Sequence, residues 1–232
     1  MHLVSAWAAR QRIVPGQQAT EEKSNQITAI PLLLKHLDLK GAPVTLDAMG
    51  TQTDIARAIR DGAIRDGGGD YCMSLKNNWS AVYADVEQLF NDPPDNVVFE
   101  TTETVDLTGG RIETRRHTVC HKVDWMTSDR RYPGEPVFLD LAMTGRIGTE
   151  VERNGKIGHE TRCYLCSLAL CALTFARAVR ARWGMENRLH WVPDVIFHED
   201  LARFRTGHGP QNMAVIRHTP SICSHAPNQR SV

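Results

Sequence analysis

The sequence predicts an α/β domain that is interrupted by a β-rich segment, and three features support this fold class. Between residues 28 and 90, short apolar strands alternate with segments of helical periodicity, as in an α/β sheet. Residues 96–166 instead alternate Thr, Val and aromatic side chains between turn residues, which is typical of antiparallel strands. A helical run at 173–181 follows. We therefore expect a sheet with flanking helices whose two parts enclose the β-rich segment.

The first 95 residues contain the predicted elements in a regular order. Strands are expected at 2–9, 13–19, 43–46 and 70–76, and helices at 28–37, 53–59 and 81–90. Pro31 should lie in the first turn of its helix, where a missing N–H costs little, and Thr53 should cap the next helix. The last of these helices should bury one apolar stripe, formed by Val82, Val86, Leu89 and Phe90.

Turn residues divide the β-rich segment. We interpret four sites as turns: Gly109-Gly110, Gly145, Gly148 and Asn154-Gly155. The Asn-Gly pair gives the strongest of these signals, because both residues accept the positive φ angles that a two-residue hairpin needs. A β-hairpin is therefore predicted around residues 154 and 155.

Asp47 is the first candidate functional residue. It ends the short apolar strand at 43–46 and is followed by Ala48-Met49-Gly50. A carboxylate at the C-terminal end of a parallel strand lies where α/β sheets place their sites. A turn residue without a further role is the structural alternative, and the pattern alone leaves both readings open.

The segment 180–200 holds a second group of candidates. Glu186, His190 and Asp194 are spaced at i, i+4 and i+8, so a continuous helix would place them on one face. Trp183 and Trp191 form a neighbouring stripe, together with Asn187. Because Trp is usually packed, Glu186 should lie at the rim of a core, where carboxylates pair with a base or bind a metal. A simple i,i+4 ion pair between Arg182 and Glu186 is the structural alternative.

Composition describes an ordinary soluble protein of 232 residues, long enough for one substantial domain or for one domain with an insertion. No apolar run has membrane length and no signal-peptide pattern is seen, so we expect a cytoplasmic chain whose six cysteines are reduced. Cys163 and Cys166 form a C-x-x-C motif. Without a second pair, and in a strand-like setting, this motif does not favour zinc.

The formal net charge is zero, but the charges are segregated along the chain. Residues 85–106 contain seven acidic residues and no Lys or Arg, whereas residues 177–217 contain seven Arg and four acidic residues. Because local patches create the field that a nucleic acid meets, a zero total does not exclude a nucleic-acid surface. Segregated charge is also common on other proteins, so this signal is weak alone.

Five motifs, in order, resemble one family. They are KSNQITAIP (23–31), VTLDAMG (44–50), GGDY (68–71), GRIETR (110–115) and WGMENRLHW (183–191). They are similar to motifs of the bacterial insertion-sequence transposases that include the H-repeat-associated proteins, a branch of the DDE superfamily. The similarity covers residues 2–217.

The resemblance implies an RNase H-like fold, with a mixed sheet and flanking helices, and three acidic residues that hold two divalent ions. Asp47 matches the second acid, Glu186 the third, and Arg182 the Arg that precedes the Glu. Two hard, oxygen-bound ions, Mg²⁺ or Mn²⁺, suit phosphodiester cleavage and strand transfer of an insertion sequence. Three further residues are expected in supporting roles: Asn187, His190 and Asp194. Double-stranded DNA is the implied partner, within a nucleoid-associated homo-oligomer.

The resemblance also implies domain limits. Residues 1–95 and 167–217 would form the two parts of the RNase H-like domain, 96–166 the β-rich insertion, and 218–232 an irregular tail. The family's first catalytic Asp would lie on a strand upstream of residue 2. We therefore expect a chain that lacks this first strand, as an N-terminally truncated and inactive copy.

Four cations are candidates for phosphate contacts: Lys76, Arg180, Arg188 and Arg205. Two alternatives to a transposase remain open. One is a metal-dependent nuclease that needs only two acids. The other is a non-catalytic DNA-binding or assembly fragment.

Overall fold

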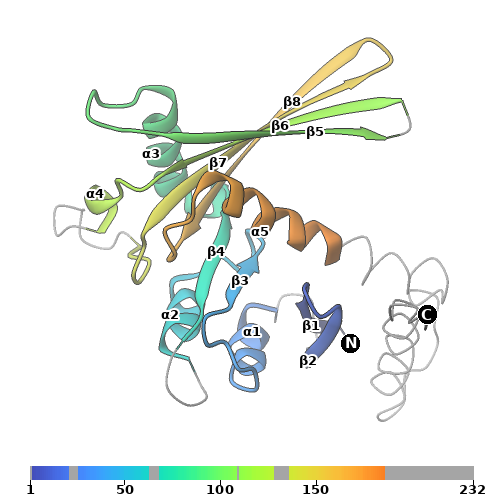
Figure 1. The fold of residues 1–232 in the computed structure, drawn as a ribbon. Coiled ribbons are helices and arrows are strands. Elements are labelled where there is room, and N and C mark those ends of the chain that lie inside the picture. Colours follow the sequence, from blue (N-terminus) through green and yellow to red (C-terminus); the bar gives the residue numbers. More distant parts are fainter. Residues whose placement is uncertain (1, 21–25, 63–67, 109, 128–135, 186–232) are drawn as a thin grey trace, which may run out of the picture. The chain divides into compact units, whose positions relative to one another are not determined.

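A computed structural model describes residues 2–20, 26–62, 68–108, 110–127 and 136–185, and Figure 1 shows its elements. The chain divides into two compact units. One contains residues 1–37 and 180–232, and the other contains residues 38–179. The predicted mixture of strands and helices is confirmed, and each unit is described by itself below.

In the first unit, a β-hairpin packs against one helix. Strands β1 (His2–Ala8) and β2 (Ile13–Thr20) pair antiparallel, close to the predicted bounds. Helix α1 (Gln26–Leu34) begins earlier than expected, so Pro31 lies in its interior and the predicted first-turn position is wrong. The ring removes one helical hydrogen bond there. Gly16 of β2 lets the helix approach, because a Cβ at this position would lie 3.0 Å from Cδ1 of Leu33.

The second unit is built on one six-stranded sheet in the order β3-β4-β8-β7-β6-β5 (Figure 1). Among the strands that the structure describes in this sheet, β3 and β4 pair parallel and all the other pairs are antiparallel. The four β-rich strands thus continue the sheet of the parallel pair, and the predicted domain limits stay a prediction. The strands are β3 (Pro43–Leu46), β4 (Asp70–Leu75), β5 (Glu100–Thr108), β6 (Arg111–Cys120), β7 (Met143–Arg153) and β8 (Lys156–Cys166).

Helices connect and cover this sheet. They are α2 (Thr53–Asp61), the 3₁₀ turn η2 (Asn77–Trp79), α3 (Ser80–Asn91), the short α4 (Asp124–Thr127) and α5 (Ala172–Met185). The predicted cap at Thr53 is wrong: Gln52 has the extended backbone of an N-cap residue, and Thr53 is already helical. The inward stripe predicted for α3 is confirmed, since its buried residues are Val82, Val86, Leu89 and Phe90.

Two helices lie on opposite faces of the sheet. Neighbouring residues of a strand point to opposite faces, and Gly145 and Arg146 are neighbours on β7. The Phe175 ring of α5 lies over Gly145. The guanidinium of Arg146, on the other face, lies 4.9 Å from the ring centroid of Phe90 on α3. The sheet is therefore enclosed between α5 and α3 over this part of its length.

A polar network fixes the N-terminal end of β4. Arg60 of α2 contacts Asp70 at 2.5 Å and Asp140 at 2.9 Å. The Ser167 hydroxyl donates to the same Asp70 carboxylate at 3.0 Å, and accepts a hydrogen bond from the backbone N–H of Tyr71. Charge-assisted contacts of this kind are stronger than neutral ones. They join α2, β4 and the chain after β8.

Glycines in β7 correct one prediction. Gly145 and Gly148 lie inside β7 and not in turns. Gly145 is needed for close approach, because a Cβ there would lie 2.5 Å from Cζ of Phe175. The Asn154-Gly155 hairpin is confirmed: both residues have positive φ, 52° and 71°, and they join the paired residues Arg153 and Lys156.

Replacing Gly145 by Ala should destabilise the protein, because the new methyl group must displace the Phe175 ring. We expect a loss of about 1–3 kcal/mol in the free energy of unfolding, measured by urea titration. Gly148→Ala is the matched control: nothing lies within 4 Å of the added Cβ, so its effect should stay within about 0.5 kcal/mol. Equal effects of both substitutions would contradict this role of Gly145.

Candidate functional site

Asp47 lies at the C-terminal edge of the parallel strand pair. It directly follows β3, and the register places Leu46 opposite Met73 of β4. Its side chain is exposed, and Oδ1 accepts a hydrogen bond from the backbone N–H of Gly50 at 3.0 Å. Within the described part of the chain, Oδ2 has no hydrogen bond. Asp47 is therefore a turn residue that still presents one carboxylate oxygen to solvent.

The loop that carries Asp47 is fixed to the chain segment after β4. The buried Thr51 hydroxyl lies 2.9 Å from the carbonyl oxygen of Asp47 and 2.6 Å from that of Ser74, so its single hydrogen is shared between them. Asn78 Nδ2 donates to the Ala48 carbonyl at 2.8 Å. Trp79 Nε1 donates to the Thr51 carbonyl at 2.6 Å. Three side chains therefore hold the backbone of Asp47 and of the loop that follows it.

Trp79 is itself held by packing. Its ring meets the buried Phe138 ring edge to face, at 5.9 Å between centroids and 81° between planes. Such aromatic pairs prefer this geometry. The indole N–H is thus aimed at the loop by a contact outside the loop, which reduces the freedom of the Asp47 backbone.

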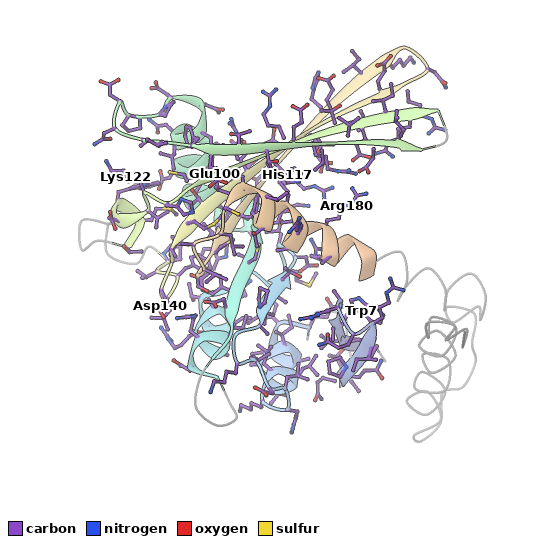
Figure 2. All side chains as sticks on the ribbon, viewed as in Figure 1. Trp7, Glu100, His117, Lys122, Asp140 and Arg180 are labelled. Atoms are coloured by element: carbon purple, nitrogen blue, oxygen red, sulfur yellow. The ribbon has the colours of Figure 1, made fainter. Side chains whose placement is uncertain are left out.

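Some other predicted site residues lie within the described chain. Lys76 directly follows β4 and is exposed at the same edge of the sheet as Asp47. Arg180 and Arg182 lie on α5, and Figure 2 labels Arg180 on that helix. Six predicted residues lie outside the described residues: Glu186, Asn187, Arg188, His190, Asp194 and Arg205. The predicted approach of Glu186 to Asp47 therefore stays a prediction.

The chemistry of this edge fits a hard cation. Carboxylate oxygen is the ligand that Mg²⁺ and Mn²⁺ prefer, and Mg²⁺ commonly uses only one or two protein carboxylates. Within the described residues, no group of three His, Cys, Asp or Glu side chains is placed to hold a metal ion. Asp47 therefore offers one ligand from a restrained loop, and a complete site needs further ligands.

The C-x-x-C motif is part of the sheet. Cys163 and Cys166 both lie in β8, three residues apart, so they point to opposite faces and cannot chelate one ion together. Burial raises the pKa of the Cys163 thiol to about 12. A hydrogen bond with Cys72, followed by burial, raises the pKa of the Cys166 thiol. These thiols therefore pack as small apolar side chains.

Several residues around the site were missed by the sequence analysis. Thr51, Asn78 and Trp79 were not predicted as site residues, although polar residues after two neighbouring parallel strands are a usable sign. Glu100 was counted only within the acidic segment. Its carboxylate accepts a hydrogen bond at 3.0 Å from the backbone N–H of Ala172, the first residue of α5 (Figure 2). A carboxylate at this end of a helix satisfies a free N–H and complements the helix dipole.

Comparison with known proteins identifies the family of the chain. A mixed sheet flanked by helices is consistent with an RNase H-like α/β fold. Within that fold class, the chain belongs to the family described as Transposase DDE domain, which matches residues 1–219. It is a transposase by family, and the family is one of enzymes.

Three relatives from Escherichia coli are similar to most of the chain. The putative transposase YncI of strain O157:H7 is 35% identical over 222 residues, which is 94% of this chain and 54% of that protein. YbfL and the H repeat-associated YhhI, both of strain K12, are 34% identical over 220 residues, which is 94% of this chain and 56% of each relative. The chain thus spans about half the length of these curated relatives.

Among the described helices, none is long and apolar enough to cross a membrane.

Replacing Thr51 by Val should destabilise the loop, because two backbone carbonyls lose the hydroxyl that they share. We expect a loss of about 1–3 kcal/mol in the free energy of unfolding. Thr51→Ser should restore most of it, since the hydroxyl returns. Thr114→Val, on strand β6, is the control with the same change in shape. An equal loss in Thr51→Ser and Thr51→Val would show that the methyl group, and not the hydroxyl, matters.

Proposed function

We propose that Asp47 is one of the carboxylates that hold Mg²⁺ or Mn²⁺ in a transposase site, with Glu186 as a second. The reaction would be DNA cleavage and strand transfer of an insertion sequence. One observation carries the proposal: an exposed carboxylate lies at the edge of the parallel pair, on a loop fixed by Thr51, Asn78 and Trp79. A restrained ligand is what positioning-dependent catalysis needs.

The residues of this edge have separate roles in the proposal. Bound divalent ions would supply Lewis-acid activation of water or a 3′-hydroxyl and stabilisation of the leaving oxygen. The Gly50 N–H holds Oδ1 of Asp47 and so orients the carboxylate, while Oδ2 has no hydrogen bond among the described residues. Lys76, exposed at the same edge, would contact a DNA phosphate.

Residues of α5 and beyond complete the proposal. Arg180, Arg188 and Arg205 are further candidates for phosphate contacts. Four residues near Glu186 would support the site: Arg182, Asn187, His190 and Asp194. Double-stranded DNA, both the ends of the element and the target, is the proposed partner, and a nucleoid-associated homo-oligomer is the proposed working form.

Metal binding by Asp47 can be measured directly. Asp47→Asn keeps an oxygen for the Gly50 N–H but removes the charge. It should weaken Mn²⁺ binding, followed by electron paramagnetic resonance, by about tenfold or more, since even the groups around a metal site contribute about 10–100-fold. Asp38→Asn is the matched control, because exposed Asp38 also accepts a backbone N–H in a turn, that of Lys40. Equal Mn²⁺ affinity of both variants and the parent chain would exclude Asp47 as a ligand.

Cleavage decides between the remaining alternatives. The purified chain is incubated with the DNA ends of its own element and Mg²⁺ or Mn²⁺. The expectation of an inactive copy predicts no strand transfer. Turnover that EDTA and Asp47→Asn both abolish would contradict inactivity and support the catalytic proposal. Cleavage without strand transfer would favour a nuclease, and DNA binding without either would favour an assembly fragment.

A further inference from the structure

The β5–β6 and β7–β8 hairpins extend beyond the helices that cover the sheet (Figure 1). The burial pattern of β8 shows this, since residues 156–161 are exposed and residues 163–166 are buried. Exposure of successive residues means that both faces of the strand meet solvent. The ends of the two hairpins therefore form an arm that no described helix covers.

The last register row of this arm carries three cations. Arg111 of β6 pairs with Arg153 of β7, and Arg153 pairs with Lys156 of β8. Residues that lie directly opposite each other in a sheet point to the same face. Neighbouring strands are about 4.8 Å apart, so the three side chains leave one face within about 10 Å. We call these three residues the hairpin-tip row.

The acidic side chains beside this row are already engaged. Asp106 and Glu113 occupy the preceding row of the same face, and the buried Arg115 forms ion pairs with both. Arg111 contacts Glu113 at 2.7 Å. Arg153 and Lys156 are exposed and have no ion pair among the residues that the structure describes. Positive charge therefore remains at the end of the arm.

The arrangement is unfavourable without a counter-charge. Like charges directly opposite on neighbouring strands are destabilising, and here two such pairs share Arg153. The other face of the arm differs, since its last row holds Leu107, Ile112, Glu152 and Ile157. The cations are thus gathered on one face. A bound polyanion would offset their repulsion.

We propose that the hairpin-tip row binds the sugar–phosphate backbone of DNA, as a contact separate from the Asp47 edge. The inference deepens the proposed function, because it concerns DNA binding by the same chain, but it needs no metal. A duplex offers about one negative charge per 1.7 Å of its axis, so a compact row of cations releases several counterions on binding. An acidic protein fits less well: in the last two rows of this face, the one apolar side chain is Val151, and protein interfaces need apolar anchors.

The test measures DNA binding by the whole chain without metal. Fluorescence anisotropy with a labelled duplex of about 25 base pairs is recorded in EDTA between about 50 and 200 mM salt. The double variant Arg153→Gln/Lys156→Gln should bind about tenfold more weakly at low salt. The plot of log K against log salt has a negative slope, and the variant should make this slope shallower by about two, since each phosphate contact contributes about one. Both side chains are exposed at a turn, so the fold should be kept.

A matched double variant separates a local contact from a general loss of charge. Arg57→Gln/Lys122→Gln removes one Arg and one Lys, both exposed, from α2 and from the segment before α4. It should leave the salt slope unchanged. Equal effects of the two double variants would overturn the proposal. So would a row variant that keeps the DNA slope but loses binding to poly-glutamate, which would identify the row as a site for acidic protein.

The two proposals fail separately. Asp47→Asn should bind the duplex in EDTA as the parent chain does, whatever it does to Mn²⁺ affinity. If the row variant keeps the salt slope of the parent chain while Asp47→Asn weakens Mn²⁺ binding as expected, only the hairpin-tip row is rejected. The expected slope change in the row variant, together with unchanged Mn²⁺ affinity in Asp47→Asn, would reject only the metal site.

Discussion

The contact of the Phe175 ring with the bare backbone of Gly145 is the constraint on which the second unit depends. Phe175 is fully buried, and it meets Tyr164 and His117 edge to face. These contacts hold α5 on the sheet, while Glu100 satisfies the first N–H of the helix. A side chain at residue 145 would lift the helix from the strands. The packing of Phe175 against the sheet therefore depends on the absence of one methyl group at residue 145.

Strand β4, which pairs with β3 on one side and β8 on the other, connects this core with the candidate site. At its N-terminal end, Asp70 is held by Arg60 and Ser167. At its C-terminal end, the Ser74 carbonyl meets the Thr51 hydroxyl of the Asp47 loop. The candidate ligand thus directly follows a strand pair in which β4 is held at both ends, although Asp47 itself is exposed. Rigidity of the frame and solvent access of the carboxylate are provided by different residues.

The sequence predicted those features that depend on local patterns. The bounds of β3, the apolar stripe of α3 and the Asn154-Gly155 hairpin follow from neighbours in the chain, and they were predicted correctly. The position of Asp47 at a strand end was also predicted. Features that depend on distant residues were not. Gly145 was wrongly predicted as a turn, because glycine is required there by the close approach of Phe175, thirty residues later. The roles of Thr51 and Trp79 depend on contacts between two loops.

The antiparallel pairing of β4 with β8 places Cys72 opposite Cys166, which lies 94 positions later in the chain. Strand β3, the other neighbour of β4, is close to it in sequence. On the ribosome, the parallel pair is complete long before the strand that covers its open edge has been made. Synthesis at roughly 5–20 residues per second gives a delay of about 5–20 s. During this interval β4, whose residues 71–75 are all buried in the finished sheet, presents unpaired backbone groups to the cell. An exposed edge of this kind pairs readily with other strands, so the nascent chain is open to mispairing at this stage of its synthesis.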